Sequence, residues 1–404
     1  MQLVNSFGMR KEAFVPRDNH VGIYVCGVTP YDTTHAGHAF TYISFDVLIR
    51  YLRYQGVNVT YVQNVTDIDD DIIRKAKQVG MAWDELGRLE TQRFREDMEQ
   101  LNWMPPDHYP LATQEIDRII EITSGLLARG YAYEKNGSVY YDVRKDPEFG
   151  QLAGLGYDEA LATANERGNY PDDPNKRDPL DFVLWQAAQP GEPTWPSPWG
   201  LGRPGWHIEC SAMSTHYLGD TVDIHGGGSD LIFPHHSCEI AQTEHFTGKS
   251  PFVRCWLHTG MVRLDGVKMS KSLGNLVMAR EVLRRAPADA MRLYLSVHHY
   301  REPWDWLEDE FAEAVNWARS LAEVAHCDAR AAGPAVDATP YKTRFLNALD
   351  DDLNTPVAIE ALRALGGEIA AKCGTHDVAA AQETLRDLGG RVLGLTFKGG
   401  NAGV

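Results

Sequence analysis

The sequence predicts an α/β fold built on a parallel sheet and followed by a helical C-terminal third. An apolar run at residues 21–25 is typical of a buried strand, and residues 41–55 place their apolar side chains on one helical face. A second strand pattern begins at residue 57, so strand, helix and strand form a parallel crossover unit. Residues 280–297 and 306–325 are patterned as amphipathic helices.

Length and composition favour a soluble enzyme of two or three domains. The chain has 404 residues, of which 43% are hydrophobic, and no apolar run reaches the length of a membrane span. Its start lacks a basic segment followed by an apolar core, and six scattered cysteines do not form a disulfide framework. A net charge of −17 argues against a large nucleic-acid-binding surface, although a local basic patch remains compatible with it. We therefore expect a cytoplasmic monomer.

The first strand leads into a turn with the properties of a phosphate site. Gly27 and Pro30 break regular structure after the strand. His35 and His38 then flank Gly37 where the helical pattern begins, three positions apart, so both imidazoles can face the same ligand. Free backbone N–H groups and the positive end of the helix dipole favour an anion there. Alone, this pattern is no more specific than two histidines in an ordinary turn.

A second motif lies more than two hundred residues further along the chain. Two lysines three apart, with serines and a glycine around them, suit the β- and γ-phosphates of ATP and the leaving pyrophosphate. Alone, they would favour the interpretation as a solvated basic loop. The stretch reads Lys268, Met269, Ser270, Lys271, Ser272. Together the histidine and lysine motifs are highly specific.

The two motifs resemble the two signatures of class I aminoacyl-tRNA synthetases. The surrounding residues resemble the cysteine-activating branch, which contains cysteinyl-tRNA synthetase and the ligase joining cysteine to glucosaminyl-inositol in mycothiol biosynthesis. The resemblance extends from about residue 4 to residue 395. It implies a Rossmann-like (HUP-type) nucleotide-binding fold split by an α+β insertion, and ATP-dependent activation of L-cysteine with Mg²⁺ accompanying the ATP.

The resemblance also implies a domain organisation. A charged helical stretch precedes the insertion, which is rich in Gly, Pro and Asp near its end and looks too small for an independent editing domain. We expect no anticodon-binding module. The expected segments are 1–104 and 206–279 for the two halves of the catalytic fold, 105–205 for the insertion, 280–396 for a helical domain that contacts the acceptor stem in such enzymes, and 397–404 for a tail.

Four residues form a candidate zinc site. His235 and Glu239 lie four apart in a segment patterned as the start of a helix, which places them on one face. Cys26 ends the first strand and Cys210 lies in the corresponding stretch of the second half, so parallel topology can bring both thiols to one sheet edge. A cysteine at a strand end is more often a small buried hydrophobe. The resemblance assigns one Zn²⁺ per chain to these four residues, with Cys238 as an alternative soft ligand or a packed side chain.

Zinc would explain selection of cysteine against serine. The two amino acids differ by one atom, which a hydrophobic pocket discriminates weakly. A zinc with one labile position can bind the substrate thiolate, whereas a hydroxyl is a poorer ligand. The resemblance has Trp206 close over the cysteine, while His225 suits either a hydrogen bond near the sulfur or packing. The expected cysteine-binding residues are Cys26, Gly27, Thr29, Trp206 and His225.

The resemblance also assigns the nucleotide site. Asn64 and Thr66 lie near the carboxyl end of the second strand, where open parallel sheets bind ligands. Three glycines at 226–228 follow a strand expected at 221–225 and imply close approach of a ligand to the backbone. The expected ATP and adenylate residues are Thr41, Asn64, Val65, Thr66, Gly228, Ser229, Asp230, Val262, Lys268, Met269, Ser270, Lys271 and Ser272. The expected catalytic residues, which stabilise phosphate charge, are His35, His38, Lys268 and Lys271.

Two local signals concern the insertion and the C-terminal helices. Strand patterns at 131–133 and 139–141 surround Asn136 and Gly137, a sequence typical of a hairpin turn. Further on, Asn354 or Thr355 can cap a helix that Pro356 begins.

The acceptor of the cysteinyl group is the open question. Because we expect no anticodon-reading module, and because Phe40 stands where the tRNA enzymes usually carry arginine, we favour the amine of glucosaminyl-inositol or a similar amino-sugar. Residues 181–185 and 223–225 and the presence of Glu239 instead resemble the tRNA enzyme, so a cysteinyl-tRNA synthetase acting on tRNA(Cys) is the alternative. A non-catalytic binding module is disfavoured by the intact histidines and lysines.

Overall fold

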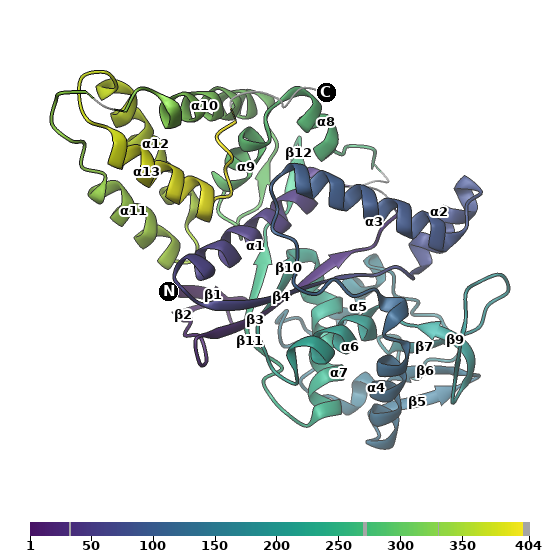
Figure 1. Ribbon diagram of the computed structural model, residues 1–404. Helices are drawn as coiled ribbons and strands as arrows, with labels where there is room; N and C mark the ends of the chain where they lie inside the picture. Colours follow the sequence, from purple (N-terminus) through teal and green to yellow (C-terminus); the bar gives the residue numbers. More distant parts are fainter. Residues whose placement is uncertain (32–33, 270–272, 330, 399–404) are drawn as a thin grey trace.

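The fold is centred on a four-stranded parallel sheet. The computed structural model describes residues 1–31, 34–269, 273–329 and 331–398. The strand order is β11-β10-β3-β4, and helix α1 (Ala36–Tyr54) makes the crossover from β3 to β4 (Figure 1). The strands are β3 (His20–Val28), β4 (Asn58–Val65), β10 (Val222–Gly228) and β11 (Val253–Thr259). This confirms the α/β fold with a parallel sheet.

The two central strands come from opposite halves of the chain. Strand β10 pairs with β3 in parallel, with Ile224 opposite Ile23 and Gly226 opposite Val25. From β3 the chain proceeds outward to β4, and from β10 it proceeds outward to β11. The strand order therefore reverses between β3 and β10, which is where open parallel sheets bind their ligands at the carboxyl edge.

The strand expected at 221–225 continues through the three glycines. Strand β10 ends at Gly228, so the glycines belong to the strand and do not form a loop after it. Glycine is required in this part of β10 because the strand packs tightly against both β11 and α1. A Cβ on Gly226 would lie 2.3 Å from the Leu257 carbonyl oxygen and 2.3 Å from Cζ of Phe45. Only glycine lets the sheet and helix α1 approach this closely.

The insertion contains its own antiparallel sheet, of order β5-β6-β7-β9-β8. Its hairpin turns at Asn136 and Gly137, whose φ angles of 55° and 80° suit the expected turn. A separate core lies between this sheet and neighbouring helices. The elements are α4 (Ile116–Ala128), β5 (Ala132–Lys135), β6 (Ser138–Tyr141), α5 (Tyr157–Glu166), β7 (Phe182–Ala187), β8 (Trp195–Ser197) and β9 (Gly200–Pro204).

The remaining elements of the catalytic fold surround the parallel sheet. Helices α2 and α3 follow β4, and α6 and α7 pack between the sheet and the insertion (Figure 1). The bounds are β1 (Gln2–Asn5), β2 (Arg10–Ala13), α2 (Asp70–Val79), α3 (Trp83–Gln100), α6 (Trp206–Leu218), the π-helical turn η4 (Ile232–His236), α7 (Ser237–Thr247), β12 (Val262–Leu264) and β13 (Val267–Lys268).

The C-terminal third is helical, as expected, and shares a core with the catalytic sheet. One hydrophobic cluster includes Ile23 of β3, Leu48 of α1, Leu295 of α9 and Leu362 of α12. The elements are α8 (Ala279–Arg285), α9 (Ala288–Ser296), β14 (Trp304–Asp305), α10 (Glu308–His326), α11 (Thr339–Asp350), α12 (Thr355–Lys372), α13 (Ala379–Arg386) and the π-helical η6 (Asp387–Val392).

In this helical region one expected feature is present and two features were not expected. Asn354 caps α12 by accepting a hydrogen bond from the Val357 N–H at 3.2 Å, as expected. Phe397, assigned to the tail, is instead buried, and its N–H donates to Asp289. Cys327 and Cys373, at the ends of α10 and α12, form a disulfide that the scattered cysteine pattern did not reveal.

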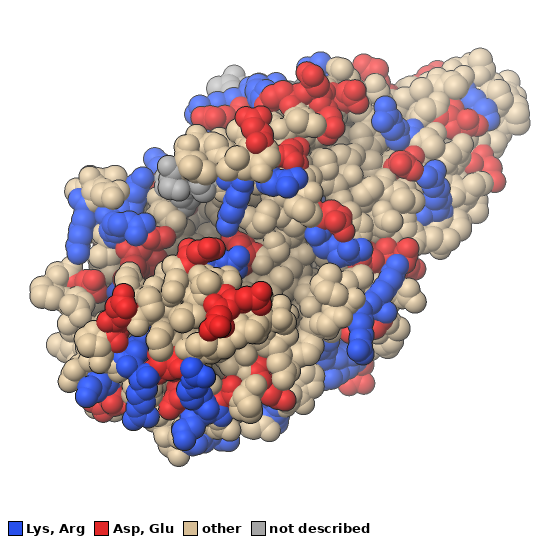
Figure 2. Space-filling model, turned by 180° about the vertical axis from the view of Figure 1, so that it is seen from behind, with Lys and Arg blue, Asp and Glu red and all other residues tan. Residues whose placement is uncertain are grey.

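The surface carries charges of both signs. Figure 2 shows acidic and basic side chains interspersed over one face, with no single large basic area on it. This distribution accords with the net charge of −17. Among the described residues, no helix is both long and apolar enough to cross a membrane.

Candidate metal and nucleotide site

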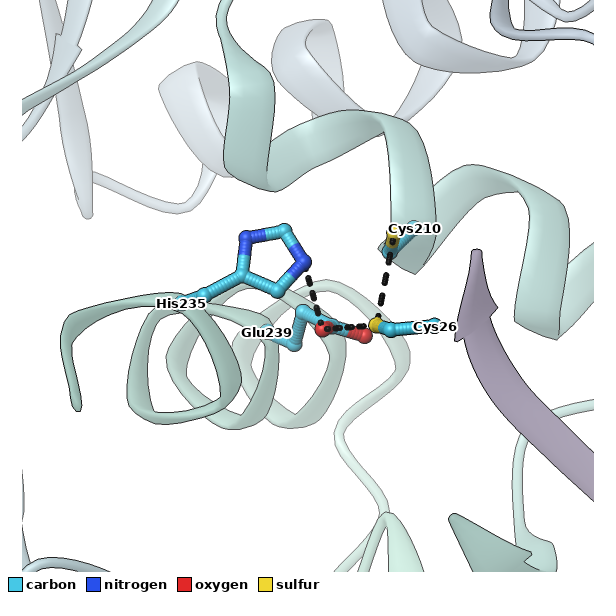
Figure 3. A group of neighbouring side chains, drawn as sticks. All are labelled: Cys26, Cys210, His235 and Glu239. Carbon is cyan, nitrogen blue, oxygen red and sulfur yellow. Dashed lines mark hydrogen bonds and ion pairs between the residues drawn. The ribbon is translucent and has the colours of Figure 1, made fainter. Parts of the chain in front are cut away.

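The four candidate metal ligands lie together at the carboxyl edge of the parallel sheet (Figure 3). Their ligand atoms are all within 4.8 Å of one another. The Cys26 Sγ is 3.7 Å from the Cys210 Sγ and 3.7 Å from Oε1 of Glu239. Nε2 of His235 is 3.2 Å from the same carboxylate oxygen. Four buried donors from three separate stretches of chain thus converge on one point.

The four ligands come from four separate elements. Cys26 is near the end of β3, as expected, and Cys210 lies on helix α6. Strand β9 ends at Pro204, and α6 begins directly after Gly205. His235 lies in the turn η4 and Glu239 in the first turn of α7, which preserves the expected one-face spacing.

Further histidines surround the same point. Nε2 of His225 lies 2.9 Å from Oε2 of Glu239, and Nε2 of His236 lies 3.3 Å from the Cys26 Sγ. His236 also contacts His258, with 2.7 Å between ring nitrogens. A second metal-compatible grouping therefore combines Cys26, His225, His236 and Glu239. Sequence reasoning did not single out His236, although its position three residues before Glu239 was an available signal.

Cys238 takes no part in either grouping. Its side chain is fully buried in the core cluster of the insertion, with Phe182 and Ala241. Of the two alternatives considered for this cysteine, the structure supports the packed side chain.

Burial disfavours the charged forms of four side chains at this point, those of Cys26, Glu239, His235 and His236. It raises the pKa of Cys26, an effect that Cys210 and Glu239 reinforce, and it raises the pKa of Glu239. It lowers the pKa values of His235 and His236 well below the usual range, because the imidazolium loses its hydration. The protein thus provides neutral imidazoles beside thiol and carboxyl groups, and a bound divalent cation would favour ionisation of those acids. Thiol, imidazole and carboxyl donors at these positions fit zinc.

Two neighbours fix the orientation of His235. Nδ1 of His235 lies 2.9 Å from Nδ1 of His207, so its Nε2 faces the cluster. The indole of Trp206 stacks on the same imidazole, with 4.3 Å between ring centroids and a 25° interplanar angle. Trp206 therefore lies against a candidate ligand at the edge of the cluster.

The histidine motif begins helix α1, next to the carboxyl end of β3. Nδ1 of His35 accepts a hydrogen bond from the Gly37 N–H at 3.1 Å and so caps the helix. The rings of His35 and His38 stack, with centroids 3.9 Å apart. One turn further on, the Thr41 hydroxyl lies 2.7 Å from that of Thr259 at the end of β11. Helix α1 thus contacts the end of β11 one turn after the motif.

The end of β4 is held against the end of β3 by polar contacts. The Gly27 N–H donates to Oδ1 of Asn64 at 2.7 Å, and the Asn64 amide donates to the Thr66 hydroxyl at 3.3 Å. A Cβ on Gly27 would lie 1.5 Å from the Asn64 carbonyl oxygen, so no other residue fits there. Val65, between Asn64 and Thr66 in the chain, is buried. Thr29, two residues after Gly27, is half-buried.

The lysine motif meets the end of β10. Nζ of Lys268 forms an ion pair with Oδ2 of Asp230 at 3.0 Å, directly after Gly228 and Ser229. The buried Met269 pairs its N–H with the Val262 carbonyl at 3.4 Å. The other motif residues, Ser270, Lys271 and Ser272, lie outside the described residues.

Comparisons with known proteins identify two family regions. A model of the class I tRNA synthetase (C) catalytic domain matches residues 13–316, about three quarters of the chain. A model of the DALR domain matches residues 344–398.

Curated relatives align over nearly the whole chain. The cysteine–tRNA ligase of Dehalococcoides mccartyi is 47% identical over 407 residues, covering 98% of this chain and 86% of that protein. The cysteine–tRNA ligase of Alkalilimnicola ehrlichii is 47% identical over 419 residues, covering 100% and 88%. The L-cysteine:1D-myo-inositol 2-amino-2-deoxy-alpha-D-glucopyranoside ligase of Thermomonospora curvata is 45% identical over 364 residues, covering 89% and 86%.

Solved structures share the fold. Mycobacterium tuberculosis methionyl-tRNA synthetase in complex with methionyl-adenylate has a TM-score of 0.66 at 16% identity, over 93% of this chain and 88% of that one. The ternary complex of Agrobacterium radiobacter LeuRS, tRNA and LeuAMS has a TM-score of 0.68 at 12% identity, over 94% and 84%. At such low identity the likeness concerns the fold alone.

Proposed function

This chain belongs to the class I tRNA synthetases of the cysteine branch, and on that premise we propose that it is a cysteine–tRNA ligase, which activates L-cysteine with ATP and transfers it to tRNA(Cys). The observation that carries the proposal is the 47% identity to cysteine–tRNA ligases over essentially the whole chain. The enzyme is an ATP-dependent ligase of the class I synthetase type.

Two expectations from the sequence are corrected here. The preference for an amino-sugar acceptor depended on the absence of an anticodon-binding module. A DALR domain is such a module, and its model matches residues 344–398, which correspond to α11, α12 and α13 and the segment after them. The segment 280–396, which we expected to be a helical domain contacting the acceptor stem, therefore contains most of this match, and the comparisons favour the tRNA acceptor.

We infer that zinc is held by Cys26, Cys210, His235 and Glu239. The support is their convergence within 4.8 Å, their burial, and a donor set in which thiols and imidazole predominate. When bound, zinc supplies a Lewis-acidic centre that prefers a thiolate to a hydroxyl, and hence cysteine to serine. Trp206 and His225 surround this position and would exclude water from it.

Residues of the nucleotide site act by positioning and by charge. The cysteine carboxylate attacks the α-phosphorus of ATP, pyrophosphate leaves, and a terminal tRNA hydroxyl then attacks the carbonyl carbon and displaces AMP. We expect His35 and His38, at the positive end of α1, to donate hydrogen bonds to phosphate oxygens. Lys268 and Lys271 neutralise charge that develops on the leaving pyrophosphate. No protein nucleophile is required.

A direct competition between acceptors tests the proposal. Purified protein is supplied with ATP, Mg²⁺ and labelled cysteine together with tRNA(Cys), glucosaminyl-inositol, or both. We expect acid-precipitable cysteinyl-tRNA and no amide product. Amide formation without charging of tRNA would replace this proposal by the amino-sugar ligase, which the 45% identity to the Thermomonospora curvata enzyme makes the second candidate.

A further inference from the structure

The segment that follows the lysine motif is bonded to the histidine motif through the backbone. His35 pairs with Met278 in an antiparallel bridge. Backbone hydrogen bonds of 2.8 and 2.9 Å lie on either side of this bridge, and the N–H groups of Ala36 and Ala279 donate them across it. The two motifs are therefore held in one register, although more than two hundred residues separate them in the chain.

One side-chain contact extends this connection to the lysine motif itself. The side-chain amide of Asn275 donates to the Lys268 carbonyl at 3.2 Å. Asn275 lies only three residues before Met278 of the bridge. A shift of the bridge segment would therefore also displace Lys268, whose ammonium is expected at the leaving pyrophosphate. The relative position of the two motifs thus depends on how residues 275–280 are anchored.

An ion pair anchors this segment to the catalytic fold. Arg280 lies in the first turn of α8, two residues after Met278, and its Nε and Nη2 donate to Oδ1 of Asp97 at 3.1 and 3.0 Å. Asp97 is near the end of helix α3 and is almost completely buried, whereas Arg280 is partly exposed. A buried carboxylate depends strongly on its counter-charge, because leaving it unpaired is costly. The pair therefore fixes α8, and with it the bridge, against α3.

We propose that Asp97 and Arg280 are positioning residues for adenylate formation, because their ion pair holds the lysine motif in place relative to the histidine motif. This inference rests on the proposed cysteine activation and deepens it. The lysines are expected to neutralise the leaving pyrophosphate, so their placement affects the step in which pyrophosphate leaves. Transfer of the cysteinyl group to tRNA comes after that departure and does not need the lysines at that place.

The test compares wild-type protein with Arg280→Gln, which removes the charge and keeps a polar side chain. Rapid-quench experiments measure two rate constants, one for formation of cysteinyl-adenylate from cysteine and ATP, and one for transfer of the cysteinyl group from that adenylate to tRNA(Cys). We expect the first rate constant to fall about 10- to 100-fold, on the order of the loss that a misplacement of about 1 Å causes. The second rate constant and the KM for cysteine should stay unchanged.

Arg285→Gln is the matched control. Arg285 lies on the same helix α8 and pairs with Glu308 at 2.7 Å, but this pair is exposed and lies at the other end of the helix. This variant should leave both rate constants unchanged. Arg280→Lys keeps the charge and should recover part of the lost rate, and it carries the same comparison if Arg280→Gln does not fold. Because Asp97 acts through Arg280, adding Asp97→Asn to Arg280→Gln should cause no further loss.

The outcomes separate this inference from the proposed function. A fall confined to adenylate formation, with recovery in Arg280→Lys, would support the positioning role. An equal fall of both rate constants, a fall of neither, or a similar fall in Arg285→Gln would overturn it. Cysteine-dependent ATP–pyrophosphate exchange by the wild-type protein tests the proposed activation separately. Its absence would reject that function, whereas normal exchange by both the wild type and Arg280→Gln would reject only the positioning role.

Discussion

At the scale of single residues, the candidate metal cluster contains side chains whose charged forms are disfavoured by burial. Cys26 and Glu239 have raised pKa values and His235 a lowered one, in each case chiefly because of burial. Without a cation, the closely spaced acidic groups cannot ionise together at low cost. Binding of the proposed zinc would therefore be coupled to ionisation of the cluster.

Replacing Cys210 with serine should therefore remove zinc and activity together. A hydroxyl binds zinc much more weakly than a thiolate does. We expect metal analysis to find the zinc content of Cys210→Ser well below that of the wild type, with cysteine-dependent ATP–pyrophosphate exchange lost in parallel. Cys255→Ser is the control, because Cys255 is buried in the main core, away from the cluster. Full zinc content in Cys210→Ser would show that Cys210 is not a ligand.

His298 provides a prediction about pH that is independent of the cluster. Burial lowers its pKa to about 4, and its ring stacks on Trp304 with centroids 3.8 Å apart. Below about pH 6.5 the His298 imidazole is protonated in the unfolded chain. In the folded chain it stays neutral until the pH falls to about 4. The titration of His298 therefore costs no stability above about pH 6.5, and it lowers the free energy of unfolding as the pH falls from about 6.5 to about 4.

His298→Phe should lessen this loss of stability. The phenyl ring keeps the stacking on Trp304 and cannot be protonated. Over this window, the free energy of unfolding of the variant should fall less steeply than that of the wild type, by up to about 1.4 kcal/mol per pH unit. Urea unfolding at several pH values measures both slopes. Identical slopes would mean that His298 binds its proton equally in the folded and unfolded states.

At the scale of elements, one buried arginine joins the helical region to the catalytic fold. Arg292 of α9 pairs with Asp46 of α1, and both side chains are almost completely buried. Arg292 also donates to the carbonyl oxygens of Leu393 at 2.7 Å and Leu101 at 2.8 Å. Asp46 in turn accepts from the Met104 N–H at 2.7 Å. Helices α1 and α9, the end of α3 and the chain after η6 therefore share one network.

Asp46→Ala should destabilise the protein strongly. It leaves the Arg292 guanidinium buried without its counter-charge, which typically costs about 3–5 kcal/mol. Chemical denaturation measures the loss. Arg285→Met is the control, because the Arg285–Glu308 pair is exposed and such pairs contribute about 0–1 kcal/mol. A similar small loss in both variants would show that the Asp46 pair does not hold these elements together.

At the scale of the whole molecule, the catalytic sheet and the C-terminal helices share one hydrophobic core, so we expect them to unfold as one unit. A single hydrophobic cluster contains Val25 of the sheet, Phe345 of α11 and Leu385 of α13. The insertion, by contrast, has its own core around Ile119 and Leu184. The segments on either side of the boundary expected near residue 280 therefore share one core and are not separate folding units.

Removal of residues 339–404 should accordingly prevent folding of the remainder. The truncated chain would expose apolar side chains of α9 and α10 that now pack against α12 and α13. We expect aggregation, or loss of near-ultraviolet circular dichroism and of ATP–pyrophosphate exchange. A chain lacking only residues 399–404 is the control and should behave as the full chain. A soluble, cooperatively unfolding 1–338 fragment with exchange activity would contradict this prediction.

The sequence by itself determined what depends on neighbouring residues. The hairpin at Asn136 and Gly137, the cap at Asn354 and the shared face of His235 and Glu239 all arise within one element, where periodicity and turn preferences act directly. The histidine and lysine motifs were likewise readable, because the residues of each motif are contiguous.

Only the tertiary structure decided how distant segments meet. Cys26 and Cys210 are 184 residues apart, and their thiols meet because α6 packs against the sheet. The same holds for His236 at Cys26 and for Asp230 at Lys268. Burial and long-range contact are properties of the assembled layers, so no local pattern in the chain encodes them separately.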